Sequence, residues 1–114
     1  MNRRKFLTSM VAAPAAAIAF PAVAAAQSSR IHIVRITDFA FVPGRIAVKP
    51  GDRIRWINDD IAPHTATATD GSWDTGELDQ GGIAEIPVTA RMHTSYYCRF
   101  HPVMKAALSL SPVT

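Results

Sequence analysis

Cysteine is nearly absent from this chain, because Cys98 is the only one among 114 residues. A single cysteine excludes an intramolecular disulfide, which small exported domains often use to supplement a small core. Long uninterrupted apolar runs are missing as well. The Ala-rich run from about Met10 to Val23 is shorter than the roughly 18–20 residues of a membrane-spanning helix, and Pro14 and Pro21 interrupt it. The sequence therefore predicts neither a disulfide scaffold nor stable insertion into a membrane.

The start of the chain reads as a targeting segment. The stretch Arg3-Arg4-Lys5-Phe6-Leu7 resembles the core of a twin-arginine export signal, and small-residue triplets at 22–24 and 24–26 suit a cleavage site. We therefore expect residues 1–26 to be a cleaved signal peptide, residues 27–114 to be one mature domain, and the mature protein to be periplasmic. Retention of the segment as an anchor is the alternative.

Neither sign of charge is in excess once that segment is removed. The full chain has a formal net charge of +3, but residues 27–114 carry nine basic and nine acidic side chains. No basic stripe of the kind that binds nucleic acid is left. We therefore expect no nucleic-acid partner, and a monomer.

Turn signals separate short apolar or alternating runs, a pattern typical of all-β sandwiches and barrels. The alternation at Ile54 and Trp56 suits a sheet with one buried face. Pro87 cannot donate to a strand ladder and predicts an edge strand. We expect strands at residues 31–36, 45–48, 53–58, 65–69, 83–88, 94–98 and 106–111, and a turn at 49–52.

Four potential metal ligands are spaced in an informative way. Cys98, His101 and Met104 lie within seven residues, and His64 lies 34 positions before Cys98. Each alone is weak, since a lone cysteine is usually a small buried hydrophobe. Together they supply the ligand set of a type 1 copper site, in which two His and one Cys form a trigonal core with a weak axial Met. A metal–thiolate bond also explains an unpaired cysteine in an exported protein.

The residues around these donors resemble those of the cupredoxins. Residues 56–64 read W-I-N-x-x-x-x-P-H, residues 97–104 read Y-C-x-x-H-P-x-M, and F-x-P, I-x-V and G-D pairs lie at 41–43, 46–48 and 51–52. The likeness covers residues 36–110 and is greatest to the amicyanins, then to plastocyanins and pseudoazurins. It implies a Greek-key β-sandwich with one copper held by His64, Cys98, His101 and Met104.

Thr65 departs from that pattern. Most members of these families have Asn there, and its side chain ties the two ligand loops together. A hydroxyl is shorter and has one donor where an amide has two. The sequence alone leaves open how these loops are tied.

The favoured function is one-electron transfer. The resemblance implies that the edge of His101 reaches solvent within an apolar rim of Ala62, Pro63, Pro102 and Val103, where donor and acceptor redox proteins dock transiently. Copper sequestration or delivery is the alternative. A copper-dependent redox enzyme would need a second copper centre, and no second His cluster is seen; His32 and His93 are expected to be surface or hydrogen-bonded residues.

Overall fold

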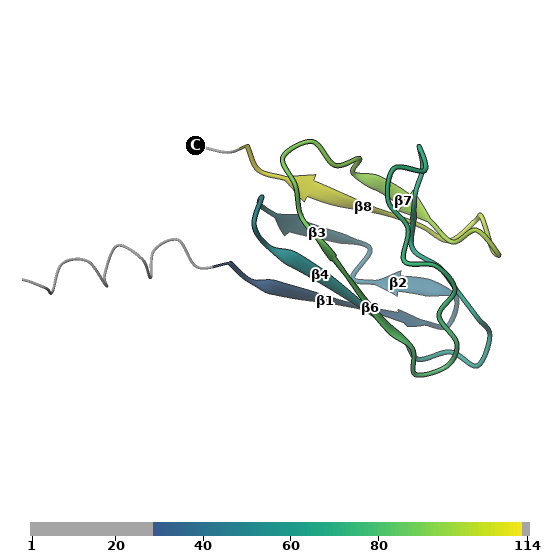
Figure 1. The fold of residues 1–114 in the computed structure, drawn as a ribbon. Helices are drawn as coiled ribbons and strands as arrows, with labels where there is room; N and C mark the ends of the chain where they lie inside the picture. The colour runs from purple at the N-terminus through teal and green to yellow at the C-terminus, as the bar shows by residue number, and fades with distance from the viewer. Residues whose placement is uncertain (1–28, 113–114) are drawn as a thin grey trace, which may run out of the picture.

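The computed structural model describes residues 29–112, in which eight strands form two packed sheets (Figure 1). The first sheet has the order β2-β1-β4-β6, with β1 at Ile31–Thr37, β2 at Ala40–Val42, β4 at Arg53–Asn58 and β6 at Ile83–Pro87. The second has the order β3-β8-β7-β5, with β3 at Arg45–Val48, β8 at Lys105–Leu110, β7 at Ser95–Tyr97 and β5 at Thr67–Ala68. Within this part of the chain no helix is long and apolar enough to cross a membrane. The predicted signal peptide lies outside the described residues.

The predicted all-β sandwich is confirmed, but two strand predictions are wrong in detail. The strand expected over residues 65–69 contracts to Thr67–Ala68, because the chain before it pairs with the loop around Leu78 instead of with a long strand. The short strand β2 was not expected. Its three residues lie between a two-residue turn and Pro43, too few for a clear alternation.

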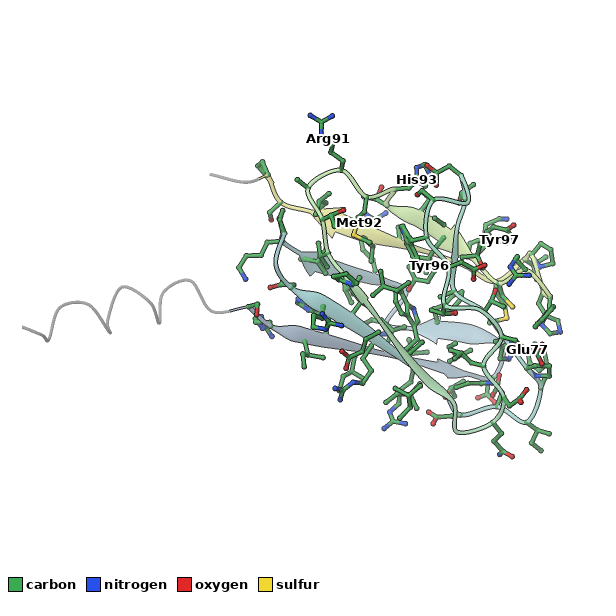
Figure 2. The ribbon with its side chains drawn as sticks, viewed as in Figure 1. Glu77, Arg91, Met92, His93, Tyr96 and Tyr97 are labelled. Atoms are coloured by element: carbon green, nitrogen blue, oxygen red, sulfur yellow. The ribbon has the colours of Figure 1, made fainter. Side chains whose placement is uncertain are left out.

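The core lies between the two sheets. Ile54 and Trp56 of β4 are fully buried, as their alternation predicted, and β1 adds Val34 and Ile36 beside them. Tyr96 of β7 points into the space between the layers (Figure 2), and burial raises the pKa of its phenol to about 12. The edge position expected for Pro87 is also confirmed, since β6 ends the first sheet.

The end of the sandwich where β1 begins is closed by the carboxylate of Asp52. It accepts hydrogen bonds from the backbone N–H groups of Arg30 and Lys49 at 3.0 and 3.1 Å, and from Lys49 Nζ and His32 Nε2 at 2.8 Å each. Burial would raise the pKa of Asp52, but these hydrogen bonds hold it well below its usual range. The hydrogen-bonded role expected of His32 is therefore confirmed.

Strand pairing places the Cys98 loop at the opposite end. β7 ends at Tyr97, β8 begins at Lys105, and these two residues are partners in the antiparallel ladder. The intervening residues 98–104 must therefore form a closed loop (Figure 1, right-hand end).

Candidate metal centre

The loop between β7 and β8 is wound tightly by its own backbone. Cys98 N donates to Met104 O at 3.1 Å, His101 N to Cys98 O at 3.2 Å, and Met104 N to His101 O at 2.9 Å. These three bonds fix the backbone at each of the three predicted ligands in the loop. Seven residues thus present a thiol, an imidazole and a thioether from one rigid hairpin end.

His64 reaches the same place from the loop between β4 and β5. It exchanges backbone hydrogen bonds with Leu78, at 3.1 Å from His64 N and 2.8 Å from Leu78 N. Asn58, at the end of β4, is fully buried and donates to Ala62 O at 2.9 Å and to Leu78 O at 2.8 Å. The loop that carries His64 is therefore fixed on both sides.

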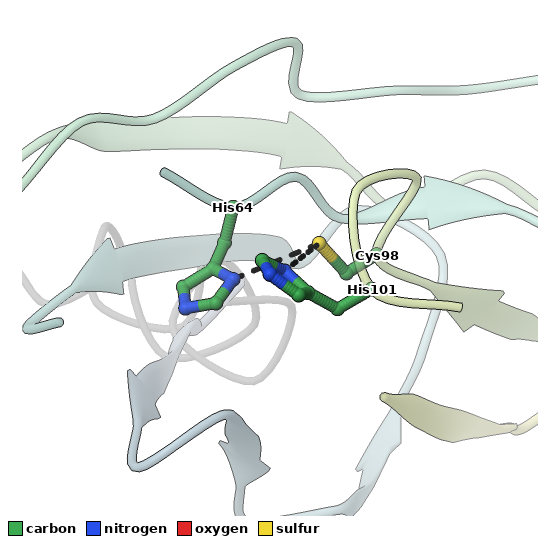
Figure 3. A group of neighbouring side chains, drawn as sticks. All are labelled: His64, Cys98 and His101. Carbon is green, nitrogen blue, oxygen red and sulfur yellow. Dashed lines mark hydrogen bonds between the residues drawn. The ribbon is translucent and has the colours of Figure 1, made fainter. Parts of the chain in front are cut away.

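The two imidazoles and the thiol converge on one point. Cys98 Sγ lies 3.7 Å from His64 Nδ1 and 3.8 Å from His101 Nδ1, along the dashed lines of Figure 3. One ligand atom from each residue lies within 4.8 Å of the other two. Metal–nitrogen bonds of about 2.0–2.1 Å and metal–sulfur bonds of about 2.3 Å, set 120° apart, separate N from S by about 3.8 Å. The donors therefore already have the spacing of a trigonal metal site.

The tautomer of His64 follows from its other nitrogen. His64 Nε2 lies 2.8 Å from Asp60 Oδ2. Burial would raise the pKa of Asp60, but hydrogen bonds from Phe39 N, His64 and Asp38 N keep it below its usual range, so the carboxylate is ionised and only accepts. In the neutral imidazole, Nε2 therefore carries the proton and the Nδ1 lone pair faces Cys98 Sγ. A carboxylate partner of this kind orients a histidine ligand and makes it a stronger donor.

Thr65 ties the two ligand loops together in place of an amide. Its backbone N–H points at Cys98 Sγ from 3.4 Å, and its buried hydroxyl accepts a hydrogen bond from Arg99 N at 2.9 Å. The question left open by the sequence is thereby answered, since the shorter side chain still spans the gap.

A chain of hydroxyls fixes the direction of that bridge. Thr67 Oγ1 donates to Asp74 Oδ1 at 3.0 Å, so its one proton is used. The 2.9 Å contact between the two threonine hydroxyls must then run from Thr65 to Thr67. Asp74 Oδ2 also meets Arg99 Nη2 at 3.1 Å, which closes the circuit on the Cys98 loop.

Solved structures with the same architecture include amicyanins, and the names of some of them refer to copper. An amicyanin from Paracoccus versutus (Thiobacillus versutus) matches 71% of this chain and 81% of its own, with 19% identity and a TM-score of 0.62. A Cu(I) amicyanin variant matches 76% of this chain and 89% of its own, with 21% identity and a TM-score of 0.62. The chain has the cupredoxin fold.

Part of a larger protein also has this fold. The Cu-containing nitrite reductase NirK from Thermus scotoductus SA-01 matches 73% of this chain with 20% identity and a TM-score of 0.64, but the match spans only 23% of the reductase chain. No protein-family model and no curated protein matches this cupredoxin-fold chain by sequence. The likeness therefore lies in the fold.

The predicted ligands of the Cys98 loop differ in how far they are buried. Met104 is buried at the end of the ligand loop, whereas His101 is only half-buried. Val103, between them, is 89% exposed and is the most exposed large hydrophobic residue of the described chain. Val103 is thus exposed, as a rim residue should be, while the apolar rim around His101 and the axial role of Met104 stay predictions.

Two residues that the sequence did not single out contact the candidate centre. Asp60 lies four positions before His64, a spacing that could have suggested a partner for it. Phe39 packs edge-on against His64 and His101, with ring centroids 5.0 and 4.8 Å away. No sequence signal marks Phe39, because its place depends on the turn between β1 and β2.

The remaining histidines are not part of this centre. His32 is bound by Asp52, and His93 Nδ1 lies 3.5 Å from Asp70 Oδ2 on a partly exposed loop. Among the described residues, His64, Cys98 and His101 are the one group of three or more His, Cys, Asp or Glu with converging ligand atoms.

Proposed function

We propose that this protein is a one-electron carrier in which His64, Cys98, His101 and Met104 hold a single type 1 copper. The observation that carries the proposal is the convergence of two Nδ1 atoms on the buried Cys98 Sγ at the spacing of a trigonal site. Copper bound there supplies reversible one-electron chemistry between Cu(I) and Cu(II).

The protein residues have separate tasks in this proposal. Cys98 binds as the thiolate, with Thr65 N–H pointing at its sulfur. Asp60 holds His64 so that Nδ1 faces inward. Met104, buried at the end of the same loop, would supply the weak fourth donor. Because both ligand loops are fixed by hydrogen bonds, little rearrangement is needed when an electron arrives or leaves.

The share of each matched protein that this chain covers favours electron transfer over an enzymatic role. The chain spans 81–89% of the two amicyanins but under a quarter of the nitrite reductase. A sequestration or delivery protein would be more natural with an open site, whereas Cys98 and His64 are fully buried. The proposal includes export to the periplasm, with residues 1–26 as the signal, and a monomeric mature protein.

Redox partners are proposed to dock transiently over the half-buried His101. Around it we propose the apolar rim predicted from the sequence, made of Ala62, Pro63, Pro102 and Val103, and the half-exposed ring of Phe39 also packs against His101. Small redox encounters use small interfaces, so a rim of this kind suits a short-lived complex. Val103→Glu should slow electron exchange with a partner, since it would bury an unpaired charge, and leave the visible spectrum unchanged.

Absorption and electron paramagnetic resonance (EPR) spectra of the purified protein with Cu(II) test the proposal. An intense visible band and a small copper hyperfine splitting are expected from Cys98 thiolate ligation. Cys98→Ser should abolish the band while circular dichroism still reports a β fold. A weakly coloured, tetragonal or readily lost Cu(II) would favour sequestration, and an unchanged band in Cys98→Ser would eliminate the assignment.

A further inference from the structure

The turn that joins β1 to β2 has an unusual backbone. Asp38 and Phe39 have φ angles of 52° and 58°, both in the left-handed region, between the paired residues Thr37 and Ala40. Two-residue hairpin turns of this type normally use Asn-Gly or Gly-Gly, because residues with bulky side chains resist positive φ. An aromatic residue there is an outlier, and such outliers cluster at functional sites.

The carboxylate of Asp60 holds this turn in place. Asp60 Oδ1 accepts from Asp38 N at 2.8 Å and Oδ2 from Phe39 N at 2.9 Å. The same Oδ2 accepts from His64 Nε2 at 2.8 Å. One carboxylate therefore connects the left-handed turn to a candidate copper ligand.

The held conformation places one ring against both imidazoles. The Phe39 ring stands at 87° to His64 and at 90° to His101, with centroids 5.0 and 4.8 Å apart, and the two imidazole centroids are 5.1 Å apart. Edge-to-face pairs at these separations are favourable beyond simple area burial. Phe39 is nevertheless 50% exposed, so burial in the core does not explain why this residue occupies an unfavourable backbone position.

We propose that Phe39 is a positioning residue that fixes the orientation of both histidine ligands, and that Asp60 maintains the strained turn that brings its ring there. The turn is a third loop of the site, beside the loops that carry His64 and Cys98. This inference rests on the proposed copper function for its consequence, but the ring contacts exist in the protein alone.

The first measurement is made on the metal-free protein. Nuclear Overhauser contacts should connect the Phe39 ring to protons of both His64 and His101, and Phe39→Ala should change the imidazole proton shifts. Phe39→Tyr, which keeps the ring, should retain the parent contacts. Val42→Ala removes an exposed apolar side chain from the same hairpin, three residues beyond Phe39, and should leave these shifts unchanged.

The second measurement uses the Cu(II) protein. Loss of aromatic contacts of this strength should reduce the population of the ordered imidazole arrangement roughly two- to twelvefold. The EPR lines of Phe39→Ala should therefore broaden, and Phe39→Tyr should restore narrow lines. Parent-like lines in Phe39→Ala, or absent ring contacts in the metal-free protein, would overturn the proposal.

A pair of variants isolates the backbone strain. Phe39→Gly and Phe39→Ala both lose the ring, but only glycine adopts the left-handed conformation freely. The folding equilibrium constant of Phe39→Gly should exceed that of Phe39→Ala about 5- to 30-fold. Equal stability would show that the turn stores no strain. If the parent protein gives no type 1 spectrum, the proposed function fails, and the metal-free contacts and this pair still decide the role of Phe39.

Discussion

Each end of the sandwich contains an Asp–His pair, and the two pairs have different roles. At the end where β1 begins, Asp52 binds His32 Nε2 at 2.8 Å and two backbone N–H groups. At the end with the candidate centre, Asp60 binds His64 Nε2 at 2.8 Å and also two backbone N–H groups. An Asp–His pair is therefore not a functional signature here.

The surroundings of each pair separate their roles. Asp52 has a cation beside it, since Lys49 Nζ donates at 2.8 Å, and its pair closes the turn between β3 and β4 onto β1. The carboxylate of Asp60 accepts instead from two backbone N–H groups and from His64, and the second nitrogen of that histidine faces a thiol. A lysine beside Asp52 and a thiol beside His64 therefore distinguish the pair that closes a turn from the pair at the candidate centre.

Removing the carboxylate at the β1 end should have the largest effect on stability. Asp52→Ala leaves the N–H groups of Arg30 and Lys49 without their acceptor, and should lower the free energy of unfolding by about 2–3 kcal/mol. Urea unfolding of the metal-free protein measures this loss. The visible spectrum with Cu(II) should stay that of the parent, and a shifted band would break the proposed division between the two ends.

The largest single contribution to the pH dependence of stability should come from the same end. The pKa of Asp52 lies well below its ordinary 3.8, so the stability it contributes is fully present above about pH 4 and is lost as the pH falls further. For one proton the slope is at most about 1.4 kcal/mol per pH unit. Asp52→Asn should flatten the metal-free unfolding profile below pH 4. A profile as steep as that of the parent would assign the acid sensitivity to other carboxylates.

Most of the strands and the approach of Cys98 to His101 were predictable from the sequence, because local patterns encode them. Alternation at Ile54 and Trp56 and the missing N–H of Pro87 predicted a buried face and an edge, and both are confirmed. The spacing of Cys98 and His101 predicted their convergence, because a short loop between paired strands leaves little choice.

The missed features depend on contacts between distant segments. Phe39 reaches the centre only because Asp60, 21 residues later, holds its turn, and no local pattern predicts an aromatic residue at positive φ. The hydroxyl circuit through Asp74 likewise joins three segments. Such interactions become visible once the sheets are assembled.

Neutralising the carboxylate at the other end should act on the proposed copper site. Asp60→Asn replaces a charged acceptor of the His64 proton by a neutral one, which stabilises Cu(II) less. The reduction potential should rise by about 40 mV, since a hydrogen bond to a charged group gains about 1 kcal/mol over a neutral one and 1.4 kcal/mol corresponds to about 59 mV for one electron. Voltammetry measures the shift, with Asp52→Asn as the matched control. Equal shifts in both variants would remove the contrast between the pairs.

The smallest expected shift in reduction potential comes from the chain of threonine hydroxyls beside the candidate centre. Thr67→Val keeps the shape of the side chain but removes the acceptor of the Thr65 hydroxyl and the donor to Asp74. The Thr65 hydroxyl is then free to rotate, which weakens its bridge to Arg99 N and thereby the tie between the Thr65 N–H and Cys98 Sγ. Neutral hydrogen bonds are roughly half as strong as charged ones, so a potential shift of about 20 mV is expected, half that of Asp60→Asn.

Two further measurements test whether the threonine hydroxyls act on the reduction potential through their hydrogen bonds or only through packing. Thr67→Ser keeps the hydroxyl and should restore the parent potential, although it loses a buried methyl group and some stability. Amide exchange at Arg99 should accelerate in Thr67→Val even in the metal-free protein, because its hydrogen bond to Thr65 is weakened. A shift that Thr67→Ser fails to restore would trace the effect to packing, and the control of the site by side-chain hydrogen bonds would then be limited to Asp60.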